Sequence, residues 1–221
     1  MKLVVVTVGF DEKLPLRGIL KVGLDAGDMV MLVYSRSGGE FEIKKVERAV
    51  EVFKGLVQST GARVVEVEVS GTSFYDDAAA VLKSLREQKA GEVVAVLAGG
   101  MRLVIFEVLF ALLMLQRFSR SQVRGRVLLM REDGLYDVAL PLESFYVTVP
   151  ESGLAVMRII HSCGEVKRSQ LVEVVSRETG LSESAVYKLV KNLAERGLVV
   201  VDGDVVKLTE LGRLLYIGTG G

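Results

Sequence analysis

Short β-branched runs alternate with helical patterns over more than half of this 221-residue chain, and this alternation constrains the fold most. Between the apolar runs, hydrophobic residues recur at spacings of three and four, as in Val46, Val50, Phe53 and Val57. Apolar strands that alternate with helices are typical of parallel sheets covered on both faces. The expected strands are residues 2–8, 28–35, 62–70, 92–98 and 125–130, with "YDVALPL" as a candidate sixth. The sequence therefore predicts an α/β domain over residues 1–138, with a Rossmann-like, doubly wound and mainly parallel sheet.

From about residue 151 the pattern changes to short amphipathic helices followed by a hairpin. The stretch "LVEVVSRETGLSESAVYKLVKNLAERG" indicates two helices joined by a turn at Gly180. The stretch "LVVVDGDVVKL" indicates a β-hairpin that turns at Asp202-Gly203. We therefore predict an α+β winged helix-turn-helix domain over residues 153–221, connected to the first domain by a linker at residues 139–152.

The last helix of the predicted helix-turn-helix carries a candidate DNA-reading face. Helical spacing places Ser184, Lys188 and Lys191 opposite the apolar stripe, where small polar and cationic side chains suit a major groove. The predicted DNA-binding residues are Ser182, Ser184, Ala185, Tyr187, Lys188 and Lys191. The alternative is a dimerisation or protein-interaction domain, since residues 151–221 contain equal numbers of basic and acidic side chains.

Composition excludes several other classes of protein. The 28 Lys and Arg balance the 28 Asp and Glu, which argues against non-specific binding of polyanions. No signal peptide or membrane span is expected, and the lone Cys163 fits a reducing compartment, so we predict a cytoplasmic protein. His161 is interpreted as structural or solvated and Asp76-Asp77 as a helix start, so no metal site is expected. The scarcity of amide side chains indicates a thermophilic source.

Three predicted strand-to-helix loops contain glycine and are candidates for binding a phosphate. They are "TVGFDEK" (7–13), "SRSGGE" (35–40) and "LAGGMR" (97–102). A strand order of 3-2-1-4-5 would place the first and last of these at the crevice where open sheets bind ligands. Glycine and helix N-termini admit phosphate, and Arg102 adds a forked donor. The alternative is that tight strand-to-helix turns require glycine in any case. No dinucleotide fingerprint, P-loop or catalytic constellation is present.

The helix expected over residues 103–118 is apolar nearly all round, which is typical of a helix buried on every side. The sheet can cover only one side of it. We therefore predict a homodimer in which the other side of the helix meets a second subunit. Such a dimer would also place its two recognition helices at the separation of two DNA half-sites. The alternative is that the linker or the second domain covers this helix.

With "VGFDEK" after the first strand, "LAGGMR" after the fourth and a winged helix at the C-terminal end, the chain resembles the CRISPR-associated Rossmann-fold (CARF) transcriptional regulators of archaeal immune loci. The resemblance implies a homodimer that binds a cyclic oligoadenylate in one composite pocket, with cyclic tetra-adenylate matching the two-fold symmetry. It also implies binding to promoters of immune genes, with no other cofactor. The implied ligand residues are Val8, Gly9, Phe10, Asp11, Ser35, Arg36, Ser37, Gly38, Ala98, Gly99, Gly100, Met101 and Arg102.

Two other functions remain open. Some CARF domains cleave their own ligand, so the resemblance also allows a metal-independent ring nuclease that uses Ser35, Ser37, Arg36 or Arg102. A redox-sensing repressor that binds NAD is disfavoured by the missing fingerprint. For the regulator, ligand would shift the inter-subunit angle and, through the linker, the separation of the recognition helices.

Overall fold

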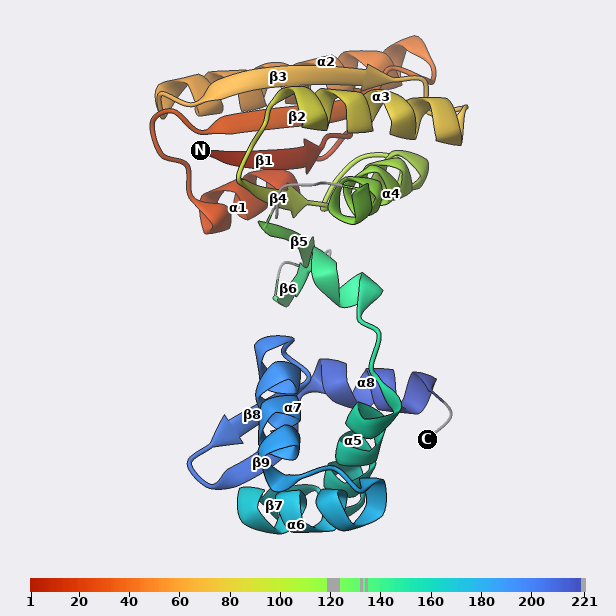
Figure 1. The fold of residues 1–221 in the computed structure, drawn as a ribbon. Coiled ribbons are helices and arrows are strands. Elements are labelled where there is room, and N and C mark those ends of the chain that lie inside the picture. The colour runs from red at the N-terminus through yellow and green to blue at the C-terminus, as the bar shows by residue number, and fades with distance from the viewer. Residues whose placement is uncertain (119–123, 132, 134, 220–221) are drawn as a thin grey trace. The chain divides into compact units, whose positions relative to one another are not determined.

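The computed structural model describes residues 1–118, 124–131, 133 and 135–219 (Figure 1). Contacts between these residues divide the chain into two units, Met1–Phe145 (unit 1) and Tyr146–Gly221 (unit 2).

Unit 1 contains a six-stranded sheet with the order β3-β2-β1-β4-β5-β6 (Figure 1). The first five strands are parallel, and only β6 pairs antiparallel, with β5. This confirms the predicted Rossmann-like, mainly parallel sheet, and β1 lies between β2 and β4, as the expected order requires. The strands are β1 (Lys2–Thr7), β2 (Met29–Ser35), β3 (Arg63–Val69), β4 (Glu92–Val96), β5 (Arg124–Met130) and β6 (Asp137–Pro141).

Four helices cover the two faces of this sheet. Alternate strand residues point to opposite faces, so Val5 joins the core under one pair of helices and Val6 the core under the other. One pair is α1 (Lys13–Val22) and α2 (Glu40–Ser59), which buries Phe53. The other is α3 (Phe74–Glu87) and α4 (Arg102–Phe118), which buries Leu112.

The sheet of unit 1 extends into the range 139–152 that the sequence predicts as a linker. Leu140 pairs with Val127 in the β5–β6 ladder. Leu142, in the 3-10 helix η1 (Leu142–Tyr146), is 1% exposed and packs so closely on Gly125 that a Cβ there would lie 2.4 Å from its Cδ1. Pro141 is tolerated because it ends an edge strand, where a missing N–H breaks little of the ladder.

Unit 2 has one core, formed by helices and a small sheet. Its order is α5 (Glu151–Cys163), β7 (Glu165–Lys167), α6 (Arg168–Thr179), α7 (Glu183–Glu195), β8 (Val199–Asp202), β9 (Val205–Leu208) and α8 (Glu210–Gly218). The strands form an antiparallel sheet in the order β7-β9-β8, in which β7 is an element that the sequence did not predict. Gly180 ends α6 in the left-handed conformation with φ +72°, and Ser182 caps α7.

None of the helices in the described part of the chain combines the length and hydropathy needed to cross a membrane.

Candidate ligand-binding site and nucleic-acid interface

The loops that follow β1 and β4 touch each other through their backbones at the carboxyl edge of the sheet. A Cβ on Gly9 would lie 2.5 Å from the Cα of Gly100, and one on Gly100 would lie 3.1 Å from the carbonyl oxygen of Val8. Gly100 also has φ +95°, in the region that only glycine adopts readily. Both glycines are therefore needed for the two loops to meet.

The adjacent Gly99 and Ala98 have a packing role in unit 1. A Cβ on Gly99 would lie 2.6 Å from Cγ of Pro15 in α1 and 3.2 Å from the carbonyl oxygen of Thr7. Ala98 packs against the core under α1 and α2. The space that the sequence assigned to a ligand at Gly99 is thus occupied by α1.

A cavity of about 90 Å³ lies where the loops after β1, β2 and β4 come together. Cavities that enclose a whole drug-sized ligand measure roughly 300–1,000 Å³, so this one encloses a single moiety of a larger ligand. Phe10 and Met101 are 51% and 39% exposed at its edge. The lining residues are Val8, Gly9, Phe10, Ser35, Ser37, Val46, Gly100 and Met101. Val46, from α2, is a lining residue that the sequence did not single out because it reads as an ordinary core position.

Two serine hydroxyls fix one wall of the cavity. Ser35 Oγ lies 2.8 Å from Ser37 Oγ and donates to the carbonyl oxygen of Ser70 at 3.0 Å, while Ser37 Oγ contacts Met101 Sδ at 3.2 Å. Gly71 packs directly against Ser35, because a Cβ at position 71 would lie 2.9 Å from Ser35 Oγ. The loop after β3 was not among the loops predicted to bind ligand. Gly71, shortly after the strand, was the feature of the sequence that could have indicated it.

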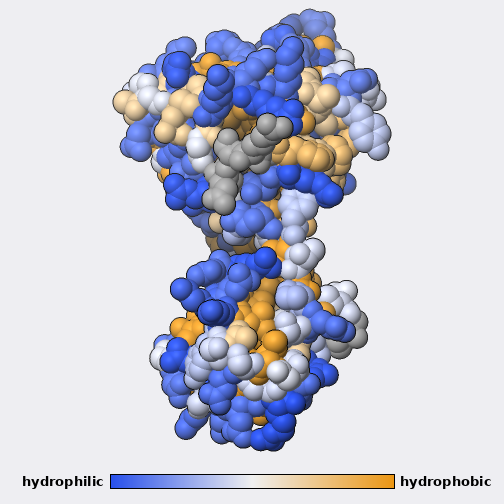
Figure 2. Space-filling model, viewed as in Figure 1, coloured by the Kyte–Doolittle hydropathy of each residue, from blue (hydrophilic) through white to orange (hydrophobic). Residues whose placement is uncertain are grey.

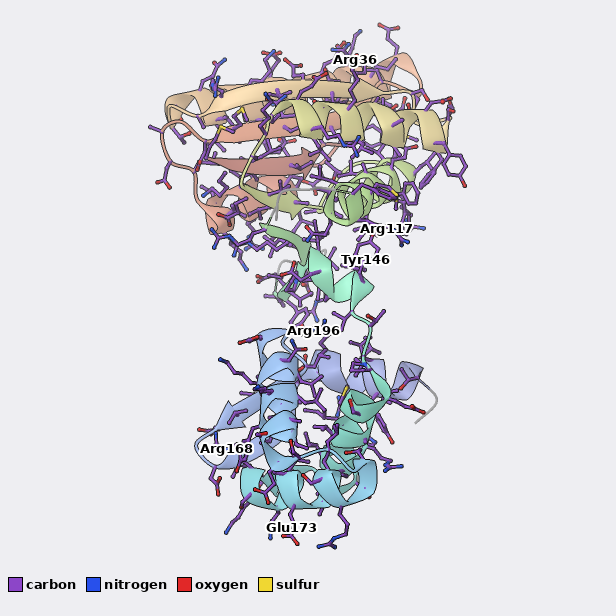
Figure 3. The ribbon with its side chains drawn as sticks, viewed as in Figure 1. Arg36, Arg117, Tyr146, Arg168, Glu173 and Arg196 are labelled. Atoms are coloured by element: carbon purple, nitrogen blue, oxygen red, sulfur yellow. The ribbon has the colours of Figure 1, made fainter. Side chains whose placement is uncertain are left out.

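The remaining residues of the predicted ligand set lie outside the cavity lining. Arg36 pairs with Glu68 at 2.8 Å and with Glu47 at 3.4 Å, which commits its guanidinium to the surface of β3 and α2 (Figure 3). Asp11 accepts a hydrogen bond from the backbone N–H of Lys13 at the start of α1. Gly38 has φ +138° in the turn before α2. These residues shape the loops around the cavity.

Arg102 is exposed at the first residue of α4, directly after the lining residue Met101. Within the described part of the chain, its guanidinium forms no ion pair or hydrogen bond. A free cation at a positive helix end attracts phosphate. The lining residues carry hydroxyls but no titratable side chain, and the described residues contain no cluster that could hold a metal ion. The arrangement is therefore suited to binding an anionic ligand.

The loop after β3 is fixed by Asp77, which with Asp76 lies in the first turn of α3, where the sequence placed a helix start. Asp77 accepts from the N–H groups of Ser70 and Gly71, both at 2.9 Å, and from Ser70 Oγ at 2.8 Å. Burial raises the pKa of Asp77, but these hydrogen bonds outweigh it and hold the pKa below the ordinary value. Asp77 is therefore ionised at neutral pH.

The outward face of α4 is apolar and open in the single chain. Phe106 is 60% and Phe118 59% exposed, and hydrophobic side chains reach the surface over this helix (Figure 2). Tyr75 of α3 extends the apolar face through an edge contact with Phe110, at 6.3 Å between ring centroids. This exposed face is the side of α4 that the sequence predicts to meet a second subunit, and the homodimer stays a prediction.

In unit 2 the predicted DNA-binding residues extend from the N-cap of α7, Ser182, to Lys191 within the helix. Ser182 Oγ accepts from the N–H of Ala185 at 3.4 Å and lies 3.2 Å from Ser184 Oγ. Tyr187 is 43% exposed, and the guanidinium of Arg168 lies 5.9 Å from its ring (Figure 3). Lys188 and Lys191 are exposed, the latter 3.8 Å from Glu195. Arg168, which begins α6, was not selected from the sequence.

The hairpin β8–β9 has an acidic tip. Exposed Asp202 and Asp204 flank Gly203, whose φ of +57° makes the turn. The backbone N–H of Arg168 donates to the carbonyl oxygen of Asp204 at 2.7 Å, which fixes the start of α6 against this tip. The tip therefore presents negative charge beside the cationic face of α7 and α6.

A wider hollow of about 750 Å³ lies between α5, the end of α6 and α8 of unit 2. Arg158 and Glu178, which line it, pair with each other at 2.5 Å. The ring centroids of His161 and Tyr216 lie 4.9 Å apart, and both His161 and Cys163 are exposed.

Comparison with known proteins places unit 1 in a family. The family model of the Csa3 CRISPR-associated Rossmann-like domain matches residues 2–133. No curated protein matches the chain. Among solved structures, Can2 from Sulfobacillus thermosulfidooxidans in complex with cyclic tetra-adenylate is similar over 99% of this chain and 64% of that chain, with a TM-score of 0.45 and 11% sequence identity. The chain thus spans less than two thirds of the length of Can2.

Proposed function

Because the chain belongs over residues 2–133 to the family of the Csa3 CRISPR-associated Rossmann-like domain, we propose that it is a transcriptional regulator of CRISPR genes that senses a cyclic oligoadenylate. Unit 1 binds the ligand and unit 2 binds promoter DNA. The observation that carries the proposal is the cavity of about 90 Å³, formed in a domain of this family by the loops after β1, β2 and β4.

The chemistry around the cavity supports a cyclic nucleotide of several units. The neutral, partly apolar lining suits a base or a ribose, and Arg102 with the N-terminus of α4 suits a phosphate beside it. A cavity of this size encloses only part of such a ring. Two copies related by a two-fold axis would supply equal halves of a pocket for cyclic tetra-adenylate, whose ring has matching symmetry.

The open apolar face of α4 supports a homodimer. Exposed aromatic side chains such as Phe106 and Tyr75 lie on α4 and α3. An exposed apolar patch of this kind on a protein surface typically marks an interface with another molecule. A second copy that packs here would lie next to Met101 and Arg102, which precede and begin α4. The dimer interface and the ligand pocket would therefore be continuous.

We assign unit 2 as a winged helix-turn-helix that binds DNA. This is supported by the order of its elements, with α6 and α7 joined at Gly180 and followed by the hairpin β8–β9. It is also supported by the face of α7 that presents Tyr187, Lys188 and Lys191. In such domains the second helix of the pair enters the major groove.

The decisive experiment measures the affinity for promoter DNA with and without cyclic tetra-adenylate at several salt concentrations. Ligand can change DNA affinity only if it binds two arrangements of the dimer with different affinity. We expect a change of about 5-fold to 150-fold, the usual range of such coupling. Equal affinities at every salt concentration would contradict the regulator, and a titration with rings of different size would identify the ligand.

Cleavage of the ligand has less support than binding. Ser35 and Ser37 supply hydroxyls to the cavity, but both are engaged in hydrogen bonds and no acid or base lines it among the described residues. Incubation with cyclic tetra-adenylate followed by chromatography would reveal linear products if the chain were a ring nuclease.

A further inference from the structure

A fully buried carboxyl group lies in the middle of α4. Glu107 is 0% exposed, and neither of its carboxylate oxygens has a hydrogen-bond partner among the described residues. Burial of an unpaired charge in a protein interior is costly, so such a group either finds a cation or holds a proton. In the sequence this position is marked only as one acidic residue in an apolar run.

The group beside Glu107 is an acid that is already ionised. Burial raises the pKa of Glu107 to about 7, and the negative charge of Asp77 on the adjacent helix α3 acts in the same direction. Asp77 keeps its charge because Ser70 and Gly71 donate to it. The one proton of the pair therefore resides on Glu107, which can donate to Asp77.

No cation faces this pair from the described elements around it. α4 packs against α3, which supplies Asp77, and against β1 and β2, which supply apolar side chains such as Val5 and Val33. The hydroxyl of Thr7, at the end of β1, is buried without a hydrogen-bond partner among the described residues. On α4 itself the other charges are Arg102 at its first residue and Arg117 in its last turn.

The pair is connected to the wall of the ligand cavity. Asp77 holds the N–H groups of Ser70 and Gly71, and the carbonyl oxygen of Ser70 accepts from Ser35 Oγ at 3.0 Å. Ser35 in turn lies 2.8 Å from Ser37 Oγ, and both serines line the cavity. A displacement of Asp77 would therefore be transmitted to the cavity by three successive contacts.

We propose that Glu107 and Asp77 share one proton across the α3–α4 interface, and that loss of this proton loosens the loop of residues 70–73 and weakens ligand binding in the cavity. The part that concerns ligand rests on the proposed function. Above neutral pH the two carboxylates repel each other without a cation between them, and Asp77 can no longer hold Ser70 and Gly71 in place. Low pH keeps the loop fixed, so ligand affinity falls as pH rises.

The first test needs no ligand. Hydrogen exchange of the Ser70 and Gly71 amides is compared at about pH 6 and about pH 8, one unit on either side of the transition. We expect the protection factors of the wild-type chain to fall severalfold at the higher pH. Glu107→Gln, which imitates the protonated acid, and Glu107→Met, which removes the polar group, should show no such fall. Glu87→Gln, at an exposed site on α3, is the matched control and should behave as wild type.

The second test measures the affinity for cyclic tetra-adenylate over the same pH range. Linkage to one proton weakens binding by up to about tenfold per pH unit above the transition, and Glu107→Gln should bind equally at both pH values. A wild-type chain with pH-independent protection, or a Glu107→Gln variant that keeps the wild-type pH dependence, would overturn the proposal. Absence of binding at every pH would contradict the proposed ligand, while the exchange measurement would still decide the role of Glu107.

Discussion

The two candidate binding surfaces of this protein are constructed in opposite ways. The proposed DNA-binding face of unit 2 comes from one helix, α7, with Arg168 beside it. The cavity wall of unit 1 comes from three loops and α2, with residues as distant in sequence as Val8 and Met101. A surface on one helix can be derived from helical periodicity, whereas a surface made by loops depends on the order of the strands that carry them.

The two surfaces also differ in their charge. The face of α7 presents the exposed cations Lys188 and Lys191, the latter 3.8 Å from Glu195. The cavity wall is neutral, and of the two arginines predicted to bind phosphate, Arg36 is paired with Glu47 and Glu68. Positive charge beside the cavity therefore depends on Arg102 alone among the predicted residues that the structure describes. We therefore expect the proposed ligand of unit 1 to be selected mainly by shape, and the proposed DNA partner of unit 2 to be attracted in part by these lysines.

The largest effect is expected from Gly9→Ala, because the added Cβ would lie 2.5 Å from the backbone of Gly100 and separate the two loops. We expect the free energy of unfolding to fall by about 2 kcal/mol and the affinity for cyclic tetra-adenylate to fall about 100-fold. Gly55→Ala is the matched control. A Cβ there meets nothing within 4 Å, so it should stabilise α2 by about 0.5–1 kcal/mol. Chemical denaturation and calorimetric titration would measure both; an unchanged affinity for Gly9→Ala would place the ligand elsewhere.

The pair Arg102→Ala and Arg36→Ala tests which arginine meets a phosphate. Arg102 is exposed and unpaired among the described residues, so its loss should weaken binding of cyclic tetra-adenylate by about tenfold or more, equivalent to a charged hydrogen bond of about 1.5–3 kcal/mol. Arg36 is engaged with two glutamates, and its removal should change affinity by less than about twofold. A larger loss for Arg36→Ala than for Arg102→Ala in a binding titration would reverse the assignment.

Lys188→Ala should weaken DNA binding about tenfold, because a cation on the groove-facing side of α7 is typically worth about 1–3 kcal/mol when it contacts DNA. Lys44→Ala, at an exposed lysine of α2 that pairs with Glu40 in unit 1, is the control and should leave DNA affinity unchanged. Electrophoretic mobility shift or anisotropy measurements would compare the two. Equal affinities for both variants would favour the protein-interaction alternative for unit 2.

A pH-dependent effect on stability is expected at the end of the sheet opposite the cavity. Burial raises the pKa of Asp28, but hydrogen bonds from the backbone of Lys2 and Asp25 and an ion pair with Lys2 at 3.3 Å outweigh it, and the pKa lies below the ordinary 3.8. Because the folded pKa is depressed, this stabilisation is present above the unfolded pKa and is lost as pH falls through the folded value.

Asp28→Asn should therefore lower the free energy of unfolding by about 1–2 kcal/mol at neutral pH, with a difference that shrinks in acid. Ligand affinity should not change, since Asp28 precedes β2 and the cavity lies at the other end of the strands. Urea unfolding at several pH values would show this; a difference that is constant with pH would mean that the charge of Asp28 is not responsible.

The smallest effect concerns the acidic tip of the β8–β9 hairpin. Asp202→Asn combined with Asp204→Asn removes two negative charges beside Arg168. We expect DNA affinity to increase by about twofold to fivefold, since exposed charges are screened at ordinary salt. Binding assays at low and high salt would detect the change. A decrease in affinity would mean that the hairpin tip contacts DNA through these residues.

Much of this molecule was predictable from local patterns. The five parallel strands, the helices between them and the β8–β9 turn at Gly203 follow from hydrophobic periodicity and glycine positions. The residues of α7 were predictable for the same reason. The short β7 was not, because three residues are too few for a pattern. The sixth strand was a candidate in "YDVALPL", but the predicted linker began within it, because proline usually indicates a linker.

The cavity was predictable only in part. The sequence placed glycine loops at one edge of the sheet, and Gly9, Gly100, Ser35 and Ser37 do line the cavity. It could not distinguish Gly99, which packs on Pro15, from Gly100, which meets Val8. It likewise could not show that Arg36 turns toward Glu47 and Glu68. Such choices depend on which atoms of distant segments come within contact distance.

The sequence by itself determined the sheet, its helices and the two-part organisation, because alternation of apolar and polar residues is a local property of strands and helices. Only the tertiary structure decided that Glu107 lies beside Asp77 and that Asp77 holds the loop behind Ser35. Burial and electrostatic fields depend on neighbours brought together by folding, so no residue's spacing along the chain could have revealed them.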